Sequence, residues 1–233
     1  MPLVLVTGAS QGIGAAIARA FAERPGARIA LVSRSADKLE AVAEDCRGRG
    51  AEAEVVPCDV TDGAAVEAMG REVTERLGVP DVLVNNAGHF EPGGFLETSP
   101  EAFRRQFEVN TVSAFLVTRA FLPAMLERGS GRVLMMGSVA SVRGYPGGAA
   151  YGAAKHALLG LARALREETK GSGVGVTTLL PGATLTPSWD GVDVPADRLM
   201  PPEDVARVAV EVATLSARTV VEEVLVRPAE GDL

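Results

Sequence analysis

The amino-acid sequence predicts a single α/β domain in which the strands of a parallel sheet alternate with helices. The 233 residues, 47% of them hydrophobic, are enough for one sizeable core. Short apolar segments alternate along the chain with longer amphipathic ones, and a glycine-rich loop joins the first strand to the first helix. We therefore expect one domain over residues 1–233.

Composition argues against several classes of partner. The formal net charge is −7 and the isoelectric point is near 5.0, so there is no basic field for nucleic acid or an anionic membrane. Two cysteines, Cys46 and Cys58, and two histidines suggest neither a disulfide framework nor a metal site. The first residues enter a strand without a basic flank or a long apolar run, so we expect no signal peptide and a cytoplasmic protein.

The first strand and the glycine loop have the pattern of a phosphate site. Leu3–Val6 is an apolar strand, Thr7–Gly14 reads T-G-A-S-Q-G-I-G, and Ala15–Phe21 has a helical pattern. Glycines let the backbone approach a pyrophosphate, and the helix N-terminus offers free N–H groups and a positive dipole end. The spacing G-x-x-x-G-x-G departs from the ordinary dinucleotide fingerprint G-x-G-x-x-G. The alternative is a tight turn without a ligand.

The second strand, Arg28–Val32, ends in Ser33-Arg34, where an NAD site would carry an acidic residue for the ribose. A hydroxyl followed by an arginine suits a 2′-phosphate instead, because the guanidinium is a forked donor matched to phosphate oxygens. This pattern predicts NADP(H) as the cofactor. The alternative for Arg34 is a solvated residue at a strand end.

Polar residues end the next two strands. Glu54–Val60 is the third predicted strand, after a helix over Asp37–Arg47, and it places Asp59 where the base of a dinucleotide would lie. Equally, Asp59 could cap the helix predicted for Thr61–Leu77. The fourth strand, Asp81–Val84, stops in Asn85-Asn86-Ala87-Gly88, whose amides can tie down backbone beside a ligand.

A long helix is expected from Pro100 to about Glu127, with Ser99 as its capping residue. Asn110 interrupts its apolar stretch. A buried amide must find hydrogen-bond partners, so Asn110 either serves a site or bonds neighbouring loops.

The candidate acid/base pair follows the fifth strand. Arg132–Met136 delivers Gly137-Ser138, the glycine-rich loop Val139–Ala150 follows, and a helix opens with Tyr151-Gly-Ala-Ala-Lys155. Residues four apart share a helix face, so the ammonium of Lys155 can act on the phenol of Tyr151. A nearby cation lowers the pKa of a tyrosine from its usual value of about 10 and makes it a usable acid/base. Alternatively, each of these residues is an ordinary part of a helix face or strand end.

The last part of the chain supplies a sixth and a seventh strand, Val174–Leu180 and Val220–Val226, with a helix opening at Pro201-Pro202 between them. Residues 181–186 read P-G-A-T-L-T, which could also be a plain proline-glycine turn. The segment Thr184–Met200 is loop-like and contains the only tryptophan, Trp189, so we expect it to cover a substrate.

Taken together, four motifs resemble the short-chain dehydrogenase/reductase family: Thr7-Gly8-x-x-x-Gly12-x-Gly14, Asn85-Asn86-Ala87-Gly88, Ser138 and Tyr151-x-x-x-Lys155. The resemblance covers nearly the whole chain. It implies a doubly wound (Rossmann-type) fold, with a mostly parallel seven-stranded sheet and helices on both faces. It also implies a nicotinamide cofactor, carbonyl/alcohol redox chemistry on a small molecule, and a homodimer or homotetramer.

The resemblance also assigns roles. Tyr151 is the proton donor in reduction, Lys155 lowers its pKa and holds the nicotinamide ribose, Ser138 binds the substrate oxygen, and Asn110 holds a water in a proton relay. The Pro-Gly turn and the threonine after it contact the nicotinamide carboxamide. The implied cofactor contacts are Gly8, Ser10, Gln11, Gly12, Ile13, Gly14, Ser33, Arg34, Asp59, Val60, Asn86, Ala87, Gly88, Tyr151, Lys155, Pro181, Gly182, Thr184 and Thr186.

The sequence therefore favours an NADP(H)-dependent oxidoreductase acting on a small, neutral carbonyl or secondary alcohol. The alternatives are a catalytically silent cofactor-binding sensor or regulatory protein, an NAD-preferring dehydrogenase, and a related epimerase or dehydratase. The intact Ser, Tyr, Lys and Asn set argues against the sensor. Candidate substrate contacts lie in the loops above the strand ends: His89, Phe90, Val139, Arg143, Tyr145, Leu185, Trp189 and Met200.

Overall fold

The computed structural model describes residues 2–232 and contains one sheet of seven parallel strands in the order β3-β2-β1-β4-β5-β6-β7. The strands are β1 (Leu3–Thr7), β2 (Arg28–Ser33), β3 (Glu52–Pro57), β4 (Val82–Asn85), β5 (Gly131–Met136), β6 (Val174–Pro181) and β7 (Glu223–Val226). The strand order reverses between β1 and β4, so a crevice for a ligand is expected above their carboxyl ends. The doubly wound α/β prediction is confirmed, and every strand pair is parallel.

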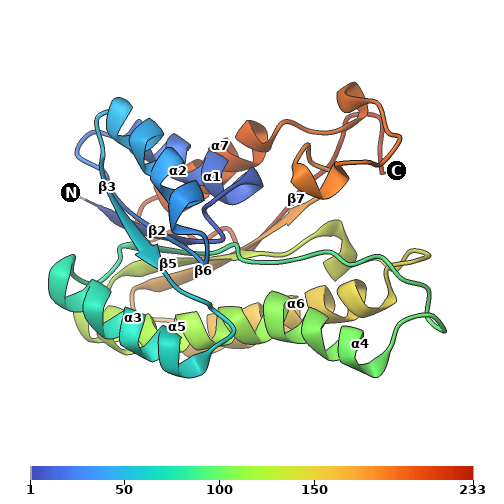
Figure 1. Ribbon diagram of the computed structural model, residues 1–233. Coiled ribbons are helices and arrows are strands. Elements are labelled where there is room, and N and C mark those ends of the chain that lie inside the picture. Colours follow the sequence, from blue (N-terminus) through green and yellow to red (C-terminus); the bar gives the residue numbers. More distant parts are fainter. Residues whose placement is uncertain (1, 233) are drawn as a thin grey trace.

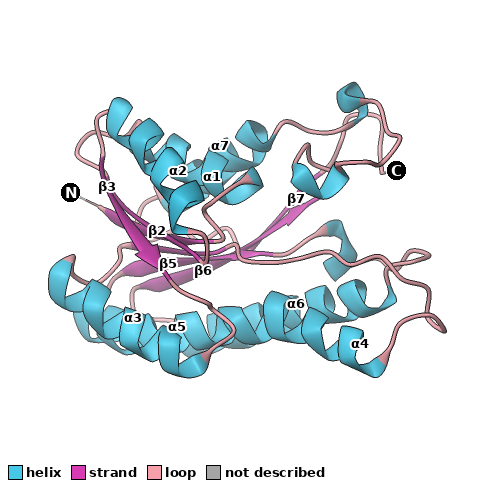
Figure 2. Ribbon diagram, viewed as in Figure 1, coloured by secondary structure: helices cyan, strands magenta, loops and turns pink. Residues whose placement is uncertain are grey.

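Helices cover both faces of the sheet (Figure 1). One layer contains α1 (Gly12–Ala22), α2 (Ala36–Gly48) and α7 (Pro202–Ala213). The other contains α3 (Gly63–Arg76), α4 (Pro100–Phe107), α5 (Ser113–Arg128) and α6 (Ala149–Thr169). Figure 2 shows the strands as a single layer between these two sets of helices.

Each face of the sheet has its own apolar core. Ile17, Phe21 and Leu39 from the helices of the first layer are buried against one face. Phe121, Met125 and Leu158 from the second layer are buried against the other. Buried on both faces, the strands are almost continuously apolar, as β1 is in Leu3-Val4-Leu5-Val6.

The predicted strand boundaries are wrong at two places. β3 runs from Glu52 to Pro57, so Cys58-Asp59-Val60 lies beyond the strand end, although Cys58 is still buried in the core. β7 begins at Glu223, not at residue 220. Apolar residues continue after the end of β3 and precede the start of β7, and periodicity alone does not mark where a strand begins or ends.

The long helix predicted from Pro100 to about Glu127 contains a π turn at Glu108–Val112, which separates α4 from α5. Such single turns are frequent at functional sites, and this one contains Asn110. By length and composition, the run Pro100–Arg128 is the one helix within residues 2–232 that could cross a membrane. Its apolar residues Val117, Phe121 and Met125 are instead buried against the sheet.

Candidate active site

The glycine loop and the end of β4 are tied together by Thr7 and Asn86. The Thr7 hydroxyl donates to the carbonyl oxygen of Val84 (3.2 Å) and accepts from the backbone N–H groups of Asn86 (3.0 Å) and Ala87 (3.1 Å). The Asn86 amide donates to the carbonyl oxygens of Thr7 (2.9 Å) and Gly8 (3.2 Å). These bonds fix the loop over the point where the strand order reverses.

The glycines of this loop are needed for conformation and for space. Gly8 and Gly12 have φ values of 64° and 58°, in the left-handed region that favours glycine. A Cβ atom at Gly14 would collide with the Asn86 amide and the Gly8 carbonyl. Helix α1 then begins without a side-chain cap and without an acidic residue in its first turn. Its first N–H groups are therefore suited to an anion such as a pyrophosphate. The neighbouring loop residues Ser10, Gln11 and Ile13 are partly or fully exposed.

The ends of β2 and β3 place Arg34 near Asp59. The Asp59 carboxylate accepts from the backbone N–H (3.0 Å) and hydroxyl (2.7 Å) of Thr61, which lowers its pKa, and Arg34 lowers it further. Arg34 is exposed and forms no ion pair within the described chain. The Ser33 hydroxyl accepts from the backbone N–H of Ser35 (3.3 Å).

Asp59 is not the cap of the following helix. Asp62 is the N-cap of α3, because its carboxylate accepts from the backbone N–H groups of Ala64 (2.9 Å) and Ala65 (3.2 Å). That alternative for Asp59 is wrong, and the helix begins at Gly63 instead of Thr61. Asp59 and the half-buried Val60 lie above the sheet on the same side as the glycine loop.

Tyr151 and Lys155 lie on one face of α6, as their spacing predicts. The ammonium nitrogen of Lys155 lies over the Tyr151 ring, 5.6 Å from its centroid, and donates to the carbonyl oxygen of Met136 at 2.8 Å. Ser138 follows two residues after the end of β5. Its hydroxyl accepts from the backbone N–H of Ala140 (3.1 Å), which holds the first turn of the loop that leads to α6. Phe90 packs edge-on against Tyr151, with a centroid distance of 5.1 Å.

Burial is the main cause of the pKa shifts of Tyr151 and Lys155. It raises the pKa of Tyr151, while the interaction of its hydroxyl with Ser138 acts in the opposite direction. Burial also lowers the pKa of Lys155 to about 8. We expected Lys155 to lower the pKa of Tyr151, and the structure shows a raised value instead. The physical reason is that removing a phenolate from water outweighs the hydrogen bond.

Asn110 is buried in the π turn, and its amide is fully engaged. It donates to the carbonyl oxygens of His89 (2.8 Å) and Gln106 (3.0 Å), and its oxygen accepts from the backbone N–H of His89 (3.2 Å). The same oxygen and the Lys155 ammonium both lie beside Gly88, 2.9 and 3.4 Å from where a Cβ atom would be. Asn110 therefore fixes the strand-end segment around His89 next to Lys155, and the relay role stays a prediction.

The Pro-Gly turn at the end of β6 joins the same site. A Cβ atom at Gly12 would lie 3.3 Å from the Thr186 side chain, so the turn meets the glycine loop. Thr186 is half-buried, whereas Thr184 is buried and donates its hydroxyl to the carbonyl oxygen of Gly182 (2.9 Å). The hydroxyl of Thr184 is thus used within the turn, and Thr186 is the threonine that faces the glycine loop.

The predicted substrate contacts divide into four groups. Phe90 and Tyr145 lie close to Tyr151, since Phe90 packs on its ring and Tyr151 contributes to the raised pKa of Tyr145, about 12, which is mainly an effect of burial. Trp189 and Val139 are half-buried, and His89, Arg143 and Leu185 are exposed. Met200 is a wrong prediction: it is buried in the core beneath α1 and α7 and bonds through its backbone to Ala183 and Leu185.

Three residues of the site were not predicted. The motif includes Thr7, but the sequence does not identify it as the side chain that joins β1 to β4. Thr111 donates to the carbonyl oxygen of Ala154 (2.8 Å) and so ties the π turn to α6. Asp232 forms an ion pair with Arg143. A hydroxyl at a strand end was the only available signal for Thr7, and the other two contacts join segments 43 and 89 residues apart.

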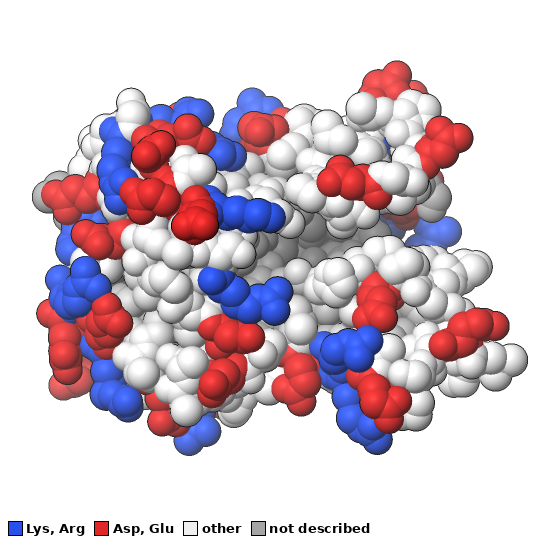
Figure 3. All heavy atoms as spheres, viewed as in Figure 1, with Lys and Arg blue, Asp and Glu red and all other residues white. Residues whose placement is uncertain are grey.

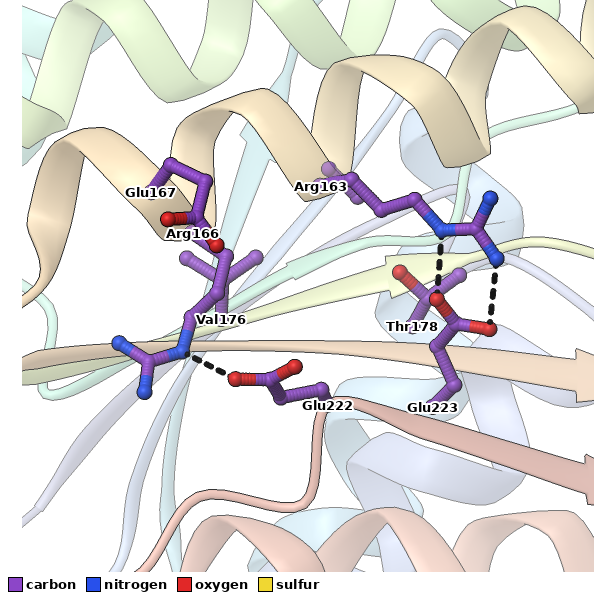
Figure 4. A pocket seen from close by; sticks show the side chains of 8 residues that line it. Arg163, Arg166, Glu167, Val176, Thr178, Glu222 and Glu223 are labelled. Atoms are coloured by element: carbon purple, nitrogen blue, oxygen red, sulfur yellow. Dashed lines mark hydrogen bonds and ion pairs between the residues drawn. The ribbon is translucent and has the colours of Figure 1, made fainter.

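Away from these residues, a cavity of about 40 Å³ lies between α6 and the start of β7 (Figure 4). Two ion pairs close it: Arg163 with Glu223 at 2.7 Å and Arg166 with Glu222 at 3.0 Å. Arg163 is twelve residues beyond Tyr151, or roughly 18 Å along the helix. The cavity lies between α6 and the edge of the sheet, where these ion pairs join the two, and it is separate from the candidate active site. No cluster of three or more His, Cys, Asp or Glu that could hold a metal occurs within residues 2–232.

The fold and these residues define a class of protein: a doubly wound α/β domain with a glycine-rich loop where the strand order reverses and a tyrosine-lysine pair at the carboxyl edge of its sheet. The family model described as short chain dehydrogenase matches residues 2–194. The chain belongs to the short-chain dehydrogenase/reductase family of oxidoreductases.

One curated relative and two solved structures illustrate the likeness. Sepiapterin reductase of Chlorobaculum tepidum is 35% identical over 99% of this chain and 98% of its own. An alcohol dehydrogenase from Thermococcus sibiricus, in complex with 5-hydroxy-NADP, superimposes with a TM-score of 0.93 at 33% identity over 100% of this chain and 99% of that one. A 7α-hydroxysteroid dehydrogenase in complex with NADH and 7-oxo glycochenodeoxycholic acid has a TM-score of 0.91 at 28% identity. The match covers 99% of this chain and 94% of that one.

Proposed function

We propose that this protein is an NADP(H)-dependent oxidoreductase that interconverts a carbonyl group and a secondary alcohol on a small, uncharged substrate. The observation that carries the proposal is the placement of Ser138, Tyr151 and Lys155 on the side of the sheet where the glycine loop and Arg34 also lie.

The residues present fit such a cofactor. The first turn of α1 has no side-chain cap and no acid, so its N–H groups favour a pyrophosphate. Arg34 is an exposed cation without an ion-pair partner in the described chain, and it follows a strand that ends in serine instead of an acid. These features favour a phosphorylated ribose, because a guanidinium pairs with phosphate in forked geometry.

The solved relatives differ in cofactor, one being complexed with a derivative of NADP and the other with NADH. The residues of this chain at the end of β2 therefore decide the proposal. An NAD-preferring dehydrogenase is the second candidate, and the NADH-bound relative is the observation that favours it. Ser33-Arg34 weighs against it, since no carboxylate is present there to accept hydrogen bonds from ribose hydroxyls.

When bound, the nicotinamide supplies or accepts the hydride. Tyr151 holds the proton that a carbonyl oxygen needs on reduction, and its raised pKa keeps it protonated at neutral pH. Ser138 provides a second hydroxyl next to Tyr151 for the same oxygen. The Lys155 ammonium, held by Met136, keeps a positive charge beneath the tyrosine ring. Phe90 packs edge-on against that ring.

The side chains around the acid/base pair favour an uncharged substrate. Phe90 and Tyr145 supply aromatic surface next to Tyr151. The half-buried Trp189 lies in the loop after β6, and Val139 adds an aliphatic side chain directly after Ser138. Two of the predicted substrate contacts are basic residues, Arg143 and His89. Arg143 is already paired with Asp232 at 2.8 Å, so its charge is not free for a substrate. The relative named sepiapterin reductase makes sepiapterin a reasonable first probe.

The proposal is tested by the loss of NADPH absorbance with a panel of ketones, aldehydes, α-ketoesters, sugars and sepiapterin, and by repeating each assay with NADH. We expect turnover of at least one uncharged carbonyl compound with NADPH. A protein that binds NADPH tightly yet turns over nothing in the panel would instead support the cofactor-binding sensor. A consistent preference for NADH would support the second candidate.

A further inference from the structure

Two ion pairs connect the segment Arg227–Asp232, which we name the clasp, with both loops that rise above the strand ends, and a third lies within the clasp. The Asp232 carboxylate lies 2.8 Å from the Arg143 guanidinium in the loop after β5 and 3.6 Å from that of Arg227. Glu230 pairs with Arg198 at 3.1 Å, in the loop that follows β6. The clasp therefore links the loop that leads to Tyr151 with the loop that contains Trp189.

The clasp lies next to residues of the active site. The backbone N–H of Gly182 donates to the carbonyl oxygen of Val226 (2.7 Å), and Pro228 lies 3.0 Å from where a Cβ atom at Gly182 would be. The clasp thus begins against the Pro-Gly turn. Arg143 donates its backbone N–H to the carbonyl oxygen of Val139 (3.1 Å), which directly follows Ser138. The backbone of Arg143 is therefore held about one turn beyond the serine, a position that we call the rim of the site.

The molecule is hollowed on this side. Figure 3 shows a depression between the two helical layers that opens toward the side where the strands end and where the red end of the chain lies in Figure 1. The Arg143 side chain is 60% exposed, whereas that of Asp232 is only 16% exposed. A carboxylate this far out of water needs a cationic partner, because an unpaired charge in such a place is costly. The pairing with Arg143 is accordingly expected to persist in solution.

We propose that Asp232 determines the charge selectivity of the substrate site. A carbonyl substrate that carries a carboxylate would need a free cation at the rim, and the backbone of Arg143 is bonded to Val139, the residue after Ser138. By pairing with Arg143, Asp232 occupies that cation and adds its own negative charge, so uncharged carbonyl substrates are preferred to anionic ones. This inference rests on the proposed carbonyl chemistry and goes beyond it by assigning the residue that sets substrate charge.

The experiment compares one substrate in its uncharged and anionic forms, ethyl benzoylformate and benzoylformate, with NADPH. We expect Asp232→Asn to raise the acid-to-ester ratio of kcat/KM at least roughly tenfold, since a hydrogen bond to a charged group corresponds to about 1.5–3 kcal/mol. Glu230→Gln is the matched control, because it removes the other ion pair of the clasp without touching Arg143, and it should leave the ratio unchanged. Adding Arg143→Ala to Asp232→Asn should abolish the gain.

Two further measurements keep the inference separable from the proposed function. Asp232→Glu keeps the charge and should keep the wild-type ratio, which excludes a mere loss of folding. If neither compound is reduced, the proposed function fails for this pair, and the inference is decided by binding. Benzoylformate is then titrated against the fluorescence of Trp189, the only tryptophan in the chain. Asp232→Asn should bind it at least roughly tenfold more tightly than wild type.

The inference is overturned if the ester is reduced and Asp232→Asn leaves the ratio as in wild type. It is also overturned if wild type and Asp232→Asn bind benzoylformate equally, or if Glu230→Gln raises the ratio as much as Asp232→Asn does. In the last case the clasp would act by holding the loops in place, without regard to the charge of Arg143.

Discussion

The ammonium nitrogen of Lys155 lies 5.6 Å from the ring centroid of Tyr151, on the face of the ring, and its hydrogen bond goes to the carbonyl oxygen of Met136. The end of β5 therefore holds the lysine, and the lysine presents its charge to the aromatic face. Both residues are buried enough that desolvation governs their pKa values, in the direction that favours the neutral form of each. This relationship carries the first two predictions.

Replacing Tyr151 by Phe should abolish carbonyl reduction. The substitution removes only the hydroxyl, and the edge-on packing with Phe90 is kept. General acid catalysis contributes about 10²–10⁴-fold, so kcat should fall at least that far while the affinity for NADPH, measured by fluorescence titration, stays within a factor of about three. A variant that retains a tenth of wild-type kcat would show that another group supplies the proton.

The pH dependence of reduction should report the ionisation of Lys155. Burial lowers its pKa to about 8, so we expect kcat/KM to be level below that pH and to fall as pH rises through it, because the cation is lost. The raised pKa of Tyr151 places its own deprotonation higher, so a fall near this pH belongs to the lysine. A profile that stays level into the range where tyrosine ionises would contradict this assignment.

Unfolding does not provide an alternative explanation for that fall. The folded-state pKa of Lys155 lies below the value of about 10.5 expected in an unfolded chain, so the unfolded state binds more protons between the two values. The contribution of Lys155 to stability therefore rises as pH increases from about 8 to about 10.5. Thermal melts across the same pH series serve as the control, and Lys155→Arg, whose guanidinium stays protonated, should lose the inflection.

Much of the fold follows from the sequence because its signals are local. The run Leu3–Val6 is apolar enough for a central strand, and the glycines after it specify a left-handed turn. Seven strands and the helices between them could be predicted in this way. The π turn at Glu108–Val112 could not, because it inserts one residue into a continuous helix and is stabilised by contacts such as Thr111 with Ala154.

The site is predictable where chemistry is carried by residue type and spacing, as for Tyr151 and Lys155. The site is less predictable where a pKa depends on opposing energies, or where a residue's position depends on segments far away in the chain. The direction of the Tyr151 pKa depends on how deeply the phenol is buried. The place of Met200 depends on how its loop returns to α7, and that return puts it in the core instead of the pocket. The pairing of Arg143 with Asp232 spans 89 residues.

Asn110 should prove important for stability, whatever its part in proton transfer. Asn110→Ala leaves the backbone N–H and carbonyl of His89 and the carbonyl of Gln106 without their partner. Unsatisfied buried groups cost about 1–3 kcal/mol each, and about 2–4 °C of melting temperature is lost per kcal/mol in a chain of this size. A decrease of roughly 5 °C or more is expected. If Asn110→Ala lowers kcat while the melting temperature is unchanged, Asn110 acts in the proton relay without this structural role.

We expect a homodimer or homotetramer, as the family resemblance implies, although several apolar residues of the long helices are not exposed. Leu158 and Leu165 are buried in the core, and Leu122 and Leu161 pack against it, because the sequence does not show which helix face meets the sheet. Phe115 is 45% exposed, and Phe103 lies on α4 with 41% exposed.

This remaining surface on α4 and α5 is the face on which we expect association. Light scattering at micromolar concentration should report a dimer or tetramer, and Phe115→Glu should shift it toward the monomer. Glutamate at Leu185, an equally exposed residue in the loop after β6, is the matched control and should leave the mass unchanged. A monomeric wild type would contradict the expectation.

The cofactor preference should follow from the end of β2, because Arg34 supplies one cation and the glycine loop supplies none. The loop residue Gln11 is exposed and can donate a hydrogen bond without adding charge. One charge-assisted contact is worth about 1.5–3 kcal/mol, so wild type should prefer NADPH by roughly one to two orders of magnitude in kcat/KM. Arg34→Ala should remove most of that preference.

Ser33→Asp should reverse the preference, because a carboxylate there repels the 2′-phosphate and accepts hydrogen bonds from the ribose hydroxyls of NADH. Lys38→Ala, which removes an exposed cation in the first turn of α2, is the control and should change the ratio less than Arg34→Ala. The assignment of Arg34 is wrong if wild type prefers NADH or if Arg34→Ala leaves the NADPH-to-NADH ratio unchanged.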